Sequence, residues 1–228
     1  MYFMVQYTLS KIAFATSMWN GEKMGKIDIN KKKKRESLLE TAFELFTSKG
    51  INETSISEIV NKAGVAKGTF YLYFRDKYDV RNLLISHKSS QIFLQAVAEL
   101  EKQNIVEIDE KIVFLANNII DQLNENKSLL TFISKNLSWG YFKSAVSSPT
   151  NSEDVNFREA YYDMLEKSGY NFKEPEIMIY MIVELVSSAC YSSILYEEPC
   201  DIEKIKPYIF DNIRFIVNSH KSEKSVKP

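Results

Sequence analysis

The sequence is short of cysteine, histidine and net charge, and each shortage excludes a class of protein. The two cysteines, Cys190 and Cys200, are too few and too isolated for a disulfide framework or a zinc site. The two histidines, His87 and His220, match no known spacing of metal ligands or of a catalytic triad. A net charge of −1 argues against a chain that coats nucleic acid indiscriminately.

Enzyme motifs are missing as well. The chain has no phosphate-binding glycine loop, no G-x-S-x-G and no His-Glu-x-x-His. We therefore expect no enzyme activity, no cofactor and no metal site. The first 18 residues are moderately apolar, but Lys11 interrupts them and no basic region precedes them, so they do not resemble a secretory signal. Reduced cysteines in a cytoplasm are the expected state.

The first residues suggest a leader that is not translated. The sequence WNGEK precedes Met24, and a Gly-Glu pair can be encoded by a purine run that resembles a bacterial ribosome-binding site. We hypothesise that translation begins at Met24, within an N-terminal extension of residues 1–30. The intact mass of the natively expressed protein tests this start.

Charge is distributed unevenly along the chain. Residues 1–81 carry 14 Lys and Arg against 9 Asp and Glu, whereas residues 82–228 carry 15 against 21. The net charges are therefore +5 and −6. This asymmetry indicates that only the front of the chain meets a polyanion.

Residues 31–80 read as a compact helical module. A first helix with an apolar face ends before Gly50, and Ser55 with Glu58 forms a capping box that opens a second helix. Gly64 can take the positive φ that changes the chain direction. A short helix then runs from about Ala66 to Phe74.

This short helix has one packing face and one polar, aromatic edge. Val65, Phe70 and Phe74 are spaced to dock against the first two helices. The pattern is typical of a helix-turn-helix, whose second helix enters the major groove of DNA. Lys67 and Thr69 are placed to read base edges, and Gly68 would allow a close backbone approach. The next helix starts after Asp76, and its first turn could bind a phosphate.

These residues closely resemble the DNA-binding signature of the TetR family of bacterial transcriptional regulators. The resemblance covers residues from about 33 to 80, and its positions are Thr54, Ile59, Ala63, Gly64, Val65, Gly68, Thr69, Tyr71, Tyr73, Phe74 and Lys77. Ala66 stands where the family often has Ser or Thr, which removes a helix cap. The residues expected to contact DNA are Thr54, Lys67, Gly68, Thr69, Tyr71, Tyr73 and Lys77.

The rest of the chain predicts an all-α domain over residues 81–220, followed by a tail of residues 221–228. Candidate helices lie near 77–103, 108–124, 127–138, 153–168, 175–196 and 201–219, and no alternating strand pattern appears. Residues 138–154 connect two of them, with a helical turn expected near 141–146. The segment 177–196 has transmembrane length, but Glu184 and four serines favour a helix buried on every side of a soluble protein.

The resemblance implies that the last two helices form a four-helix bundle with a second copy of the chain. Such a homodimer would present two recognition helices to a palindromic operator. The interface residues expected from the sequence are Ser187, Tyr191, Ile209, Ile213 and Ile216. The alternative is that these two helices only complete the core of one chain.

The resemblance also implies that a small-molecule effector enters the domain of residues 81–220 and changes the position of the DNA-binding module. The candidate pocket residues are Phe132, Trp139, Tyr141, Tyr161, Tyr162, Tyr180 and Glu184. Aromatic residues of this kind can equally form a packed core. Glu184 could bind a cationic ligand or pair with a basic residue across the dimer.

The sequence thus predicts a TetR-like repressor that an effector releases from its operator. The alternative is a DNA-bound recruiter whose C-terminal domain holds a protein partner.

Overall fold

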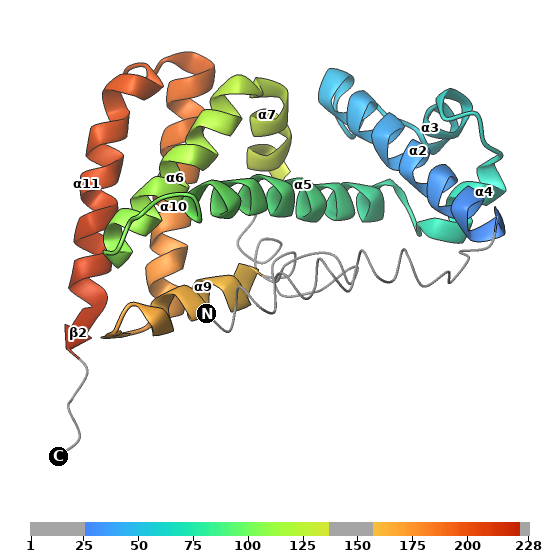
Figure 1. Ribbon diagram of the computed structural model, residues 1–228. Helices are drawn as coiled ribbons and strands as arrows, with labels where there is room; N and C mark the ends of the chain where they lie inside the picture. Colours follow the sequence, from blue (N-terminus) through green and yellow to red (C-terminus); the bar gives the residue numbers. More distant parts are fainter. Residues whose placement is uncertain (1–25, 137–156, 224–228) are drawn as a thin grey trace.

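The computed structural model describes residues 26–136 and 157–223, and the description of the fold is confined to them. The hypothesis of a start at Met24, the turn near 141–146, and Trp139 and Tyr141 lie outside these ranges. The described chain is helical apart from one short pair of strands, as predicted. A head of three helices and a larger helical body are joined by one long helix (Figure 1).

The head contains α2 (Lys26–Lys49), α3 (Ile56–Lys62) and α4 (Lys67–Tyr73), and α5 (Lys77–Leu100) runs from the head into the body (Figure 1). The body contains α6 (Ile108–Glu125), α7 (Lys127–Asn136), α9 (Phe157–Lys167), α10 (Pro175–Tyr196) and α11 (Ile202–His220). These bounds agree with the predicted helices to within a few residues. The predicted domain boundary near residue 80 falls inside α5, which passes through it without a break.

Two strands were not predicted. β1 (Tyr170–Phe172) pairs antiparallel with β2 (Lys221–Glu223), with Asn171 opposite Ser222. Three residues are too few for an alternating pattern to stand out in a sequence. The ammonium of Lys221 lies 3.6 Å from the centroid of the Tyr170 ring, which helps to hold the end of α11 against the turn after α9.

The apolar side chains form two cores, and α5 and α7 contribute to both. In the head, Leu38, Ile59 and Phe70 pack with Val80 and Ile85 of α5. In the body, Ile92 of α5 packs with residues of α6, α10 and α11. From α7, Phe132 belongs to the head core, Leu130 belongs to the body core and Ile133 packs against both. The head is therefore mounted on the body through two shared helices.

Polar contacts tie α11 to α6 on the other side of the body. The buried ammonium of Lys206 donates to Asp121 at 2.5 Å and to Glu203 at 2.8 Å. Burial lowers the pKa of Lys206, but the two carboxylates outweigh it and raise the pKa overall. Arg214 makes a two-pronged contact with Glu110, at 2.7 and 3.1 Å. These pairs fix the register of α11 along α6.

The helix α10 is not buried on every side, contrary to the sequence interpretation. Only 28% of its most apolar stretch is buried, and Ile177, Tyr180, Met181 and Glu184 are exposed. In the described ranges, it is the one helix whose length and composition would allow it to cross a membrane. This is weak evidence for a membrane span, because core helices of soluble proteins have the same length and composition. An apolar sequence alone does not distinguish a face in the protein's own core from a face at the surface.

Phe132 offers a test of how the head is attached. Its ring packs edge-on against Phe43, with the centroids 5.3 Å apart, and stacks on Phe46 at 6.4 Å. We expect Phe132→Ala to lower the free energy of unfolding by about 3 kcal/mol, because it leaves a cavity between α2 and α7. Thermal unfolding followed by circular dichroism measures the loss. Leu72→Ala, at an exposed position, is the control and should change stability by less than about 0.5 kcal/mol. A similar loss in both variants would contradict the account.

Candidate nucleic-acid interface and internal cavity

The start of α3 and the turn that follows it are built as the sequence predicts. The Ser55 hydroxyl accepts from the Glu58 backbone N–H at 3.2 Å, and the Glu58 carboxylate accepts from the Ser55 N–H at 2.9 Å. Lys49 donates to Glu58 at 2.5 Å, and this bond, together with those from Ser55, lowers the pKa of Glu58 to about 2. Gly64 takes a φ of +68°, which suits glycine and lets the chain change direction.

The next helix, α4, buries its phenyl rings and exposes its other side. Phe70 and Phe74 are buried in the head core. Lys67, Gly68 and Tyr71 are exposed, and the exposed fraction of Tyr71 is 53%. Ala66 precedes the helix and makes no side-chain cap, as its residue type predicts. The outer edge of α4 is therefore free to touch another molecule.

Gly68 is not required by the packing of the chain itself. A Cβ atom added at this position would meet no atom within 4 Å. Glycine inside a helix costs roughly 0.5–1 kcal/mol relative to alanine. The fold does not require a glycine at position 68. The close approach of a DNA backbone would explain it, because glycine has no side chain to block the contact.

The structure places two of the predicted contact residues in structural positions instead. Thr54 is buried, and its hydroxyl donates to the carbonyl of Gly50 at 2.8 Å. The ammonium of Lys77 donates to three backbone carbonyls, those of Ile51, Asn52 and Thr54, at 2.8, 3.1 and 2.9 Å. These side chains hold the turn between α2 and α3. Their donors are engaged within the chain, and direct contact of Thr54 and Lys77 with DNA stays a prediction.

The first turn of α5 is also occupied. The Asp76 carboxylate accepts from the backbone N–H groups of Tyr78 and Asp79, each at 2.8 Å. These bonds lower the pKa of Asp76, chiefly the one from Asp79. A phosphate at this helix end would have to displace a carboxylate. Thr69 and Tyr73 are half-buried, and Tyr73 packs against the head core.

Sequence reasoning missed one residue of the outer edge. Leu72 is 79% exposed on α4, between Tyr71 and Tyr73. Leucine is ordinarily assigned to a core, so its type concealed its position. Its helical spacing from Phe70 and Phe74, which are both buried, was the available signal.

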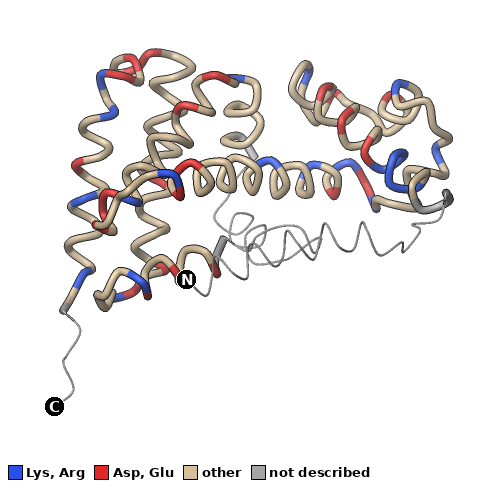
Figure 2. The backbone as a smooth tube through the Cα atoms, in the orientation of Figure 1, with Lys and Arg blue, Asp and Glu red and all other residues tan. Residues whose placement is uncertain are grey.

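Basic side chains extend this surface along α2. Lys31 to Lys34 are exposed in the first turns of α2, and the guanidinium of Arg35 lies 5.9 Å from the centroid of the Phe74 ring. The Lys and Arg residues of α2 therefore gather beside α4 (Figure 2). Like charges three residues apart on a helix, such as those of Lys31 and Lys34, destabilise an isolated helix, so this arrangement favours an anionic partner over isolated helix stability.

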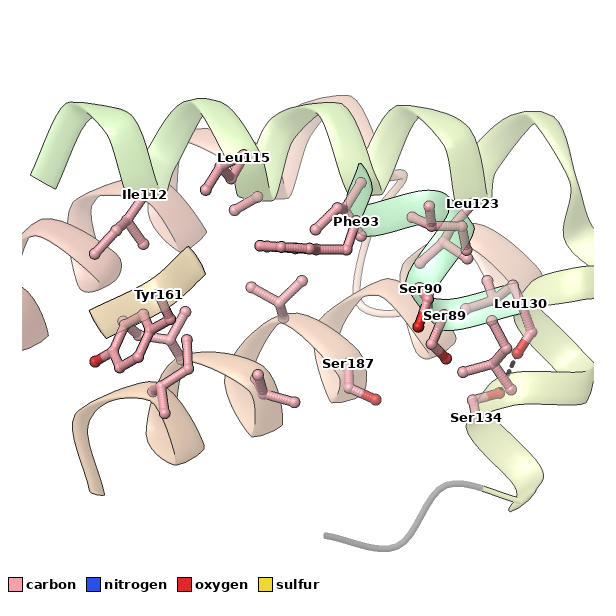
Figure 3. Close-up of a pocket in the computed structure, with 18 of the residues that line it drawn as sticks. Ser89, Ser90, Phe93, Ile112, Leu115, Leu123, Leu130, Ser134, Tyr161 and Ser187 are labelled. Atoms are coloured by element: carbon pink, nitrogen blue, oxygen red, sulfur yellow. Dashed lines mark hydrogen bonds between the residues drawn. The ribbon is translucent and has the colours of Figure 1, made fainter. Parts of the chain in front are cut away.

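The body contains a cavity of about 190 Å³ between α5, α6, α7, α9 and α10 (Figure 3). It is lined by apolar side chains with a few hydroxyls: Ser89, Ser90, Ile92, Phe93, Ile112, Leu115, Ala116, Ile119, Leu123, Leu130, Ile133, Ser134, Tyr161, Met164, Ile179, Ile182, Val183, Val186 and Ser187. Of the predicted effector residues that lie in the described ranges, only Tyr161 lines it. Its hydroxyl donates to the carbonyl of Pro175 at 2.8 Å, and burial raises its pKa.

The other predicted pocket residues within the described ranges lie elsewhere. Phe132 is in the head core, and Tyr162 is half-buried outside the lining. Tyr180 and Glu184 are exposed on the outer face of α10. The reason is the helical phase: Ile179 and Val183 face the cavity, and Tyr180 and Glu184, each one residue further on, are turned by about 100° toward solvent.

The predicted dimer residues need a similar correction. Ile209, Ile213 and Ile216 are buried in the core of the single chain, and Ser187 lines the cavity, so they cannot form an outer face. Tyr191 is half-buried, with its hydroxyl 3.2 Å from that of Tyr196. The apolar stripe of α11 faces its own body. The exposed apolar residues of these helices are instead Ile177, Tyr180, Met181, Tyr196, Tyr208 and Phe215.

A short exposed helix after a tight turn, next to a basic helix and carried on a helical body, defines a helix-turn-helix protein. Residues 38–83 match the family model described as bacterial regulatory proteins, tetR family. The match covers the head and the start of α5, and it agrees with the resemblance that the sequence pattern indicated.

Known proteins with similar sequences and folds agree with this assignment. The chain is 44% identical over 63 residues to the uncharacterized HTH-type transcriptional regulator YvdT of Bacillus subtilis, covering 26% of this chain and 32% of that protein. Its fold is similar to that of a TetR-family regulator from Syntrophomonas wolfei, with a TM-score of 0.63 at 18% identity over 86% and 99% of the two chains. The regulator FadR of Bacillus subtilis, solved with stearoyl-CoA, gives a TM-score of 0.51 at 15% identity over 78% and 97%.

The sequence matches and the structural matches cover different shares of the chains. The sequence matches to the curated relatives cover from about a sixth to a half of the relatives' own lengths. The structural neighbours have under 25% identity and show the all-helical fold of the whole described chain. The proteins named here are regulators and not enzymes.

Lys77 and Lys67 should separate stability from DNA contact. We expect Lys77→Met to lower the free energy of unfolding by about 2 kcal/mol, because it removes an ammonium that satisfies three carbonyls. Lys67→Ala, at an exposed site on α4, should change stability by less than about 0.5 kcal/mol. Urea denaturation of both variants makes the measurement. If Lys77→Met were as stable as the wild type, the three bonds would not hold the turn.

Proposed function

We propose that the protein is a bacterial cytoplasmic transcriptional regulator: a homodimer that binds a palindromic operator through α4 and is released by a small-molecule effector. One observation carries this proposal. The cavity and the DNA-binding head share α5 and α7, so a molecule that fills the cavity presses on the helices that hold the head.

The DNA side of the proposal rests on the outer edge of α4. Lys67 can donate to the O6 or N7 of guanine, and the exposed Leu72 can pack on the methyl group of thymine. Tyr71 can donate its hydroxyl to a phosphate. The lysines of α2 add charge to the backbone contact, and Thr54 and Lys77 support the turn from inside.

The switch rests on residues that contact the two regions. Ser89, Ser90 and Phe93 line the cavity from the same helix that packs Val80 and Ile85 into the head. Ile133 of α7 lines the cavity and also packs against the head core, one residue after Phe132. An effector can shift the position of the head only if it binds the two arrangements with different affinity.

The expected sign of the switch is repression followed by release. None of the buried residues of the head core lines the cavity, so the contacts that build the head do not require an effector. A ligand that expands the cavity would displace α5 or α7 and change the distance between the two recognition helices. The alternative of a protein recruiter leaves the cavity without a use, and we do not favour it.

The dimer face is proposed on the exposed sides of α10 and α11. Phe215 is 73% exposed and Tyr208 is 68% exposed, one above the other on α11 at a spacing of seven residues. Tyr180 and Met181 are exposed on α10, which packs against α11. A second copy seated there would bury this apolar surface and set two α4 helices about one DNA turn apart, roughly 34–36 Å.

Operator binding is the direct test of the function. We expect the wild-type protein to bind DNA from upstream of its own gene more tightly than random DNA, with an affinity that falls steeply as salt rises. Lys67→Ala should lose about 1–3 kcal/mol on the operator and much less on random DNA. Fluorescence anisotropy over a salt series measures both, with Lys102→Ala in the body as the control. Equal losses on both DNAs, or none, would contradict a base-reading Lys67.

Phe215 tests the dimer face. We expect Phe215→Glu to convert a dimer to a monomer, because it places charges in a desolvated apolar contact. Analytical ultracentrifugation gives the mass, and Gln95→Glu, exposed on α5, is the charge-matched control. A dimer that survives Phe215→Glu would move the interface elsewhere, and a wild-type monomer would remove it.

A further inference from the structure

The chemistry of the cavity restricts what can bind there. No Asp, Glu, Lys, Arg or His is among the described residues that line it. Its polar groups are the hydroxyls of Ser89, Ser90, Ser134, Tyr161 and Ser187. An ion moved from water into such a site would lose its hydration and meet no counter-charge. The site therefore favours an uncharged molecule.

The polar groups are not spread evenly. Ser89, Ser90 and Ser134 gather at one end of the cavity, near Leu123 and Leu130, whereas the ring of Tyr161 lies at the other end (Figure 3). Two of the hydroxyls are already engaged: Ser134 donates to the carbonyl of Leu130 at 2.6 Å, and Tyr161 donates to Pro175. The space between the two ends is lined by apolar side chains and by Ser187 (Figure 3).

Ser89 differs from those two. Its hydroxyl oxygen is buried, and it is the one buried side-chain polar atom in the described part of the chain that has no hydrogen-bond partner. A buried polar group without a partner costs about 1–3 kcal/mol, so such groups are rare in folded proteins. A hydroxyl of this kind on the wall of a cavity is a free hydrogen-bonding point for a ligand.

Size gives the last restriction. A cavity of 150 Å³ in a protein core is known to bind benzene, and this one is about 190 Å³. It therefore suits a molecule of roughly six to ten non-hydrogen atoms. An eighteen-carbon chain such as that in the FadR complex would not fit without expansion, and the described lining offers no cation for the phosphates of coenzyme A.

We infer that the ligand of this cavity is a small uncharged lipophile with one hydrogen-bonding group, which it places against the Ser89 hydroxyl. A substituted phenol is the simplest example of the class. The inference rests on the proposed function in one respect, that this cavity is the effector site, and it adds the chemical class of the effector and the residue that recognises its polar group.

Three probes of one shape test the class. 4-Ethylphenol is neutral near pH 7 and can hydrogen-bond, ethylbenzene lacks the hydroxyl, and 4-ethylbenzoate is an anion. We expect isothermal titration of the full chain to give the tightest binding for 4-ethylphenol, about tenfold weaker binding for ethylbenzene and no measurable binding for 4-ethylbenzoate. Stearoyl-CoA is the fourth probe and should bind at least tenfold more weakly than 4-ethylphenol.

Two variants test the residue. Ser89→Ala should weaken 4-ethylphenol about tenfold and leave ethylbenzene unchanged, because only the phenol loses a partner. It should also raise the melting temperature of the ligand-free protein, since it removes a buried group without a partner. Ser188→Ala, exposed on α10, is the matched control and should change neither property.

The results separate this inference from the proposed function. Tight binding of the benzoate or of stearoyl-CoA, binding of no probe, or unchanged discrimination in Ser89→Ala would each overturn the inference. Operator DNA is included in a parallel anisotropy experiment. Binding of 4-ethylphenol through Ser89 without release of DNA would support the inference and count against the proposed switch. Release of DNA by a different class of molecule would support the proposed switch and count against the inference.

Discussion

The packing of Phe132 between α2 and α7 is the contact on which the arrangement of this molecule depends. The head is small, and α5 alone would join it to the body as a rod that could turn about one end. The ring of Phe132 fixes a second point, against Phe43 and Phe46. Since Ile133 follows it on the cavity side, the same short helix carries both the attachment of the head and a wall of the cavity. Interiors are densely packed, so a change at one face of such a helix is felt at the other.

Inside the head, buried or half-buried polar side chains satisfy backbone carbonyls that apolar packing cannot satisfy. The turn between α2 and α3 exposes several carbonyls that no helix satisfies. The ammonium of Lys77 bonds three of them, and the Thr54 hydroxyl bonds the carbonyl of Gly50. Lys77 is also the first residue of α5, so the turn, and with it the approach angle of α3 and α4, is tied to the helix that enters the body. These two residues therefore hold the turn and the helices that follow it in place.

The local features of the fold could be predicted from the sequence, and the long-range ones could not. The capping box at Ser55, the positive φ of Gly64 and the missing cap at Ala66 each depend on a few neighbouring residues, and all three are present. The bonds of Lys77 cross more than twenty residues, and no periodicity reports them. The isoleucine stripe of α11 was recognised correctly as apolar. The surface against which it packs was not predicted correctly. An apolar stripe that packs inside one chain has the same sequence pattern as a stripe that packs against a second copy. The cavity could not be predicted for a related reason: its walls are mostly aliphatic, and aliphatic residues in a helix look the same in a sequence whether they line a cavity or fill a core.

The helix α10 shows how a single element can serve two purposes through its phase. Ile179, Ile182, Val183, Val186 and Ser187 line the cavity, whereas Tyr180, Met181 and Glu184 lie outside. A rigid helix cannot move its inner face without moving its outer face, so a ligand that displaced α10 from the cavity would also change the affinity of a partner on the outer face. Such linkage is reciprocal: a partner that fixes α10 changes the affinity of the cavity for its ligand by the same factor. The sequence contains the same constraint in its alternation of aliphatic residues with tyrosine, methionine and glutamate. That alternation explains why α10 is apolar throughout and yet only partly buried in a single chain.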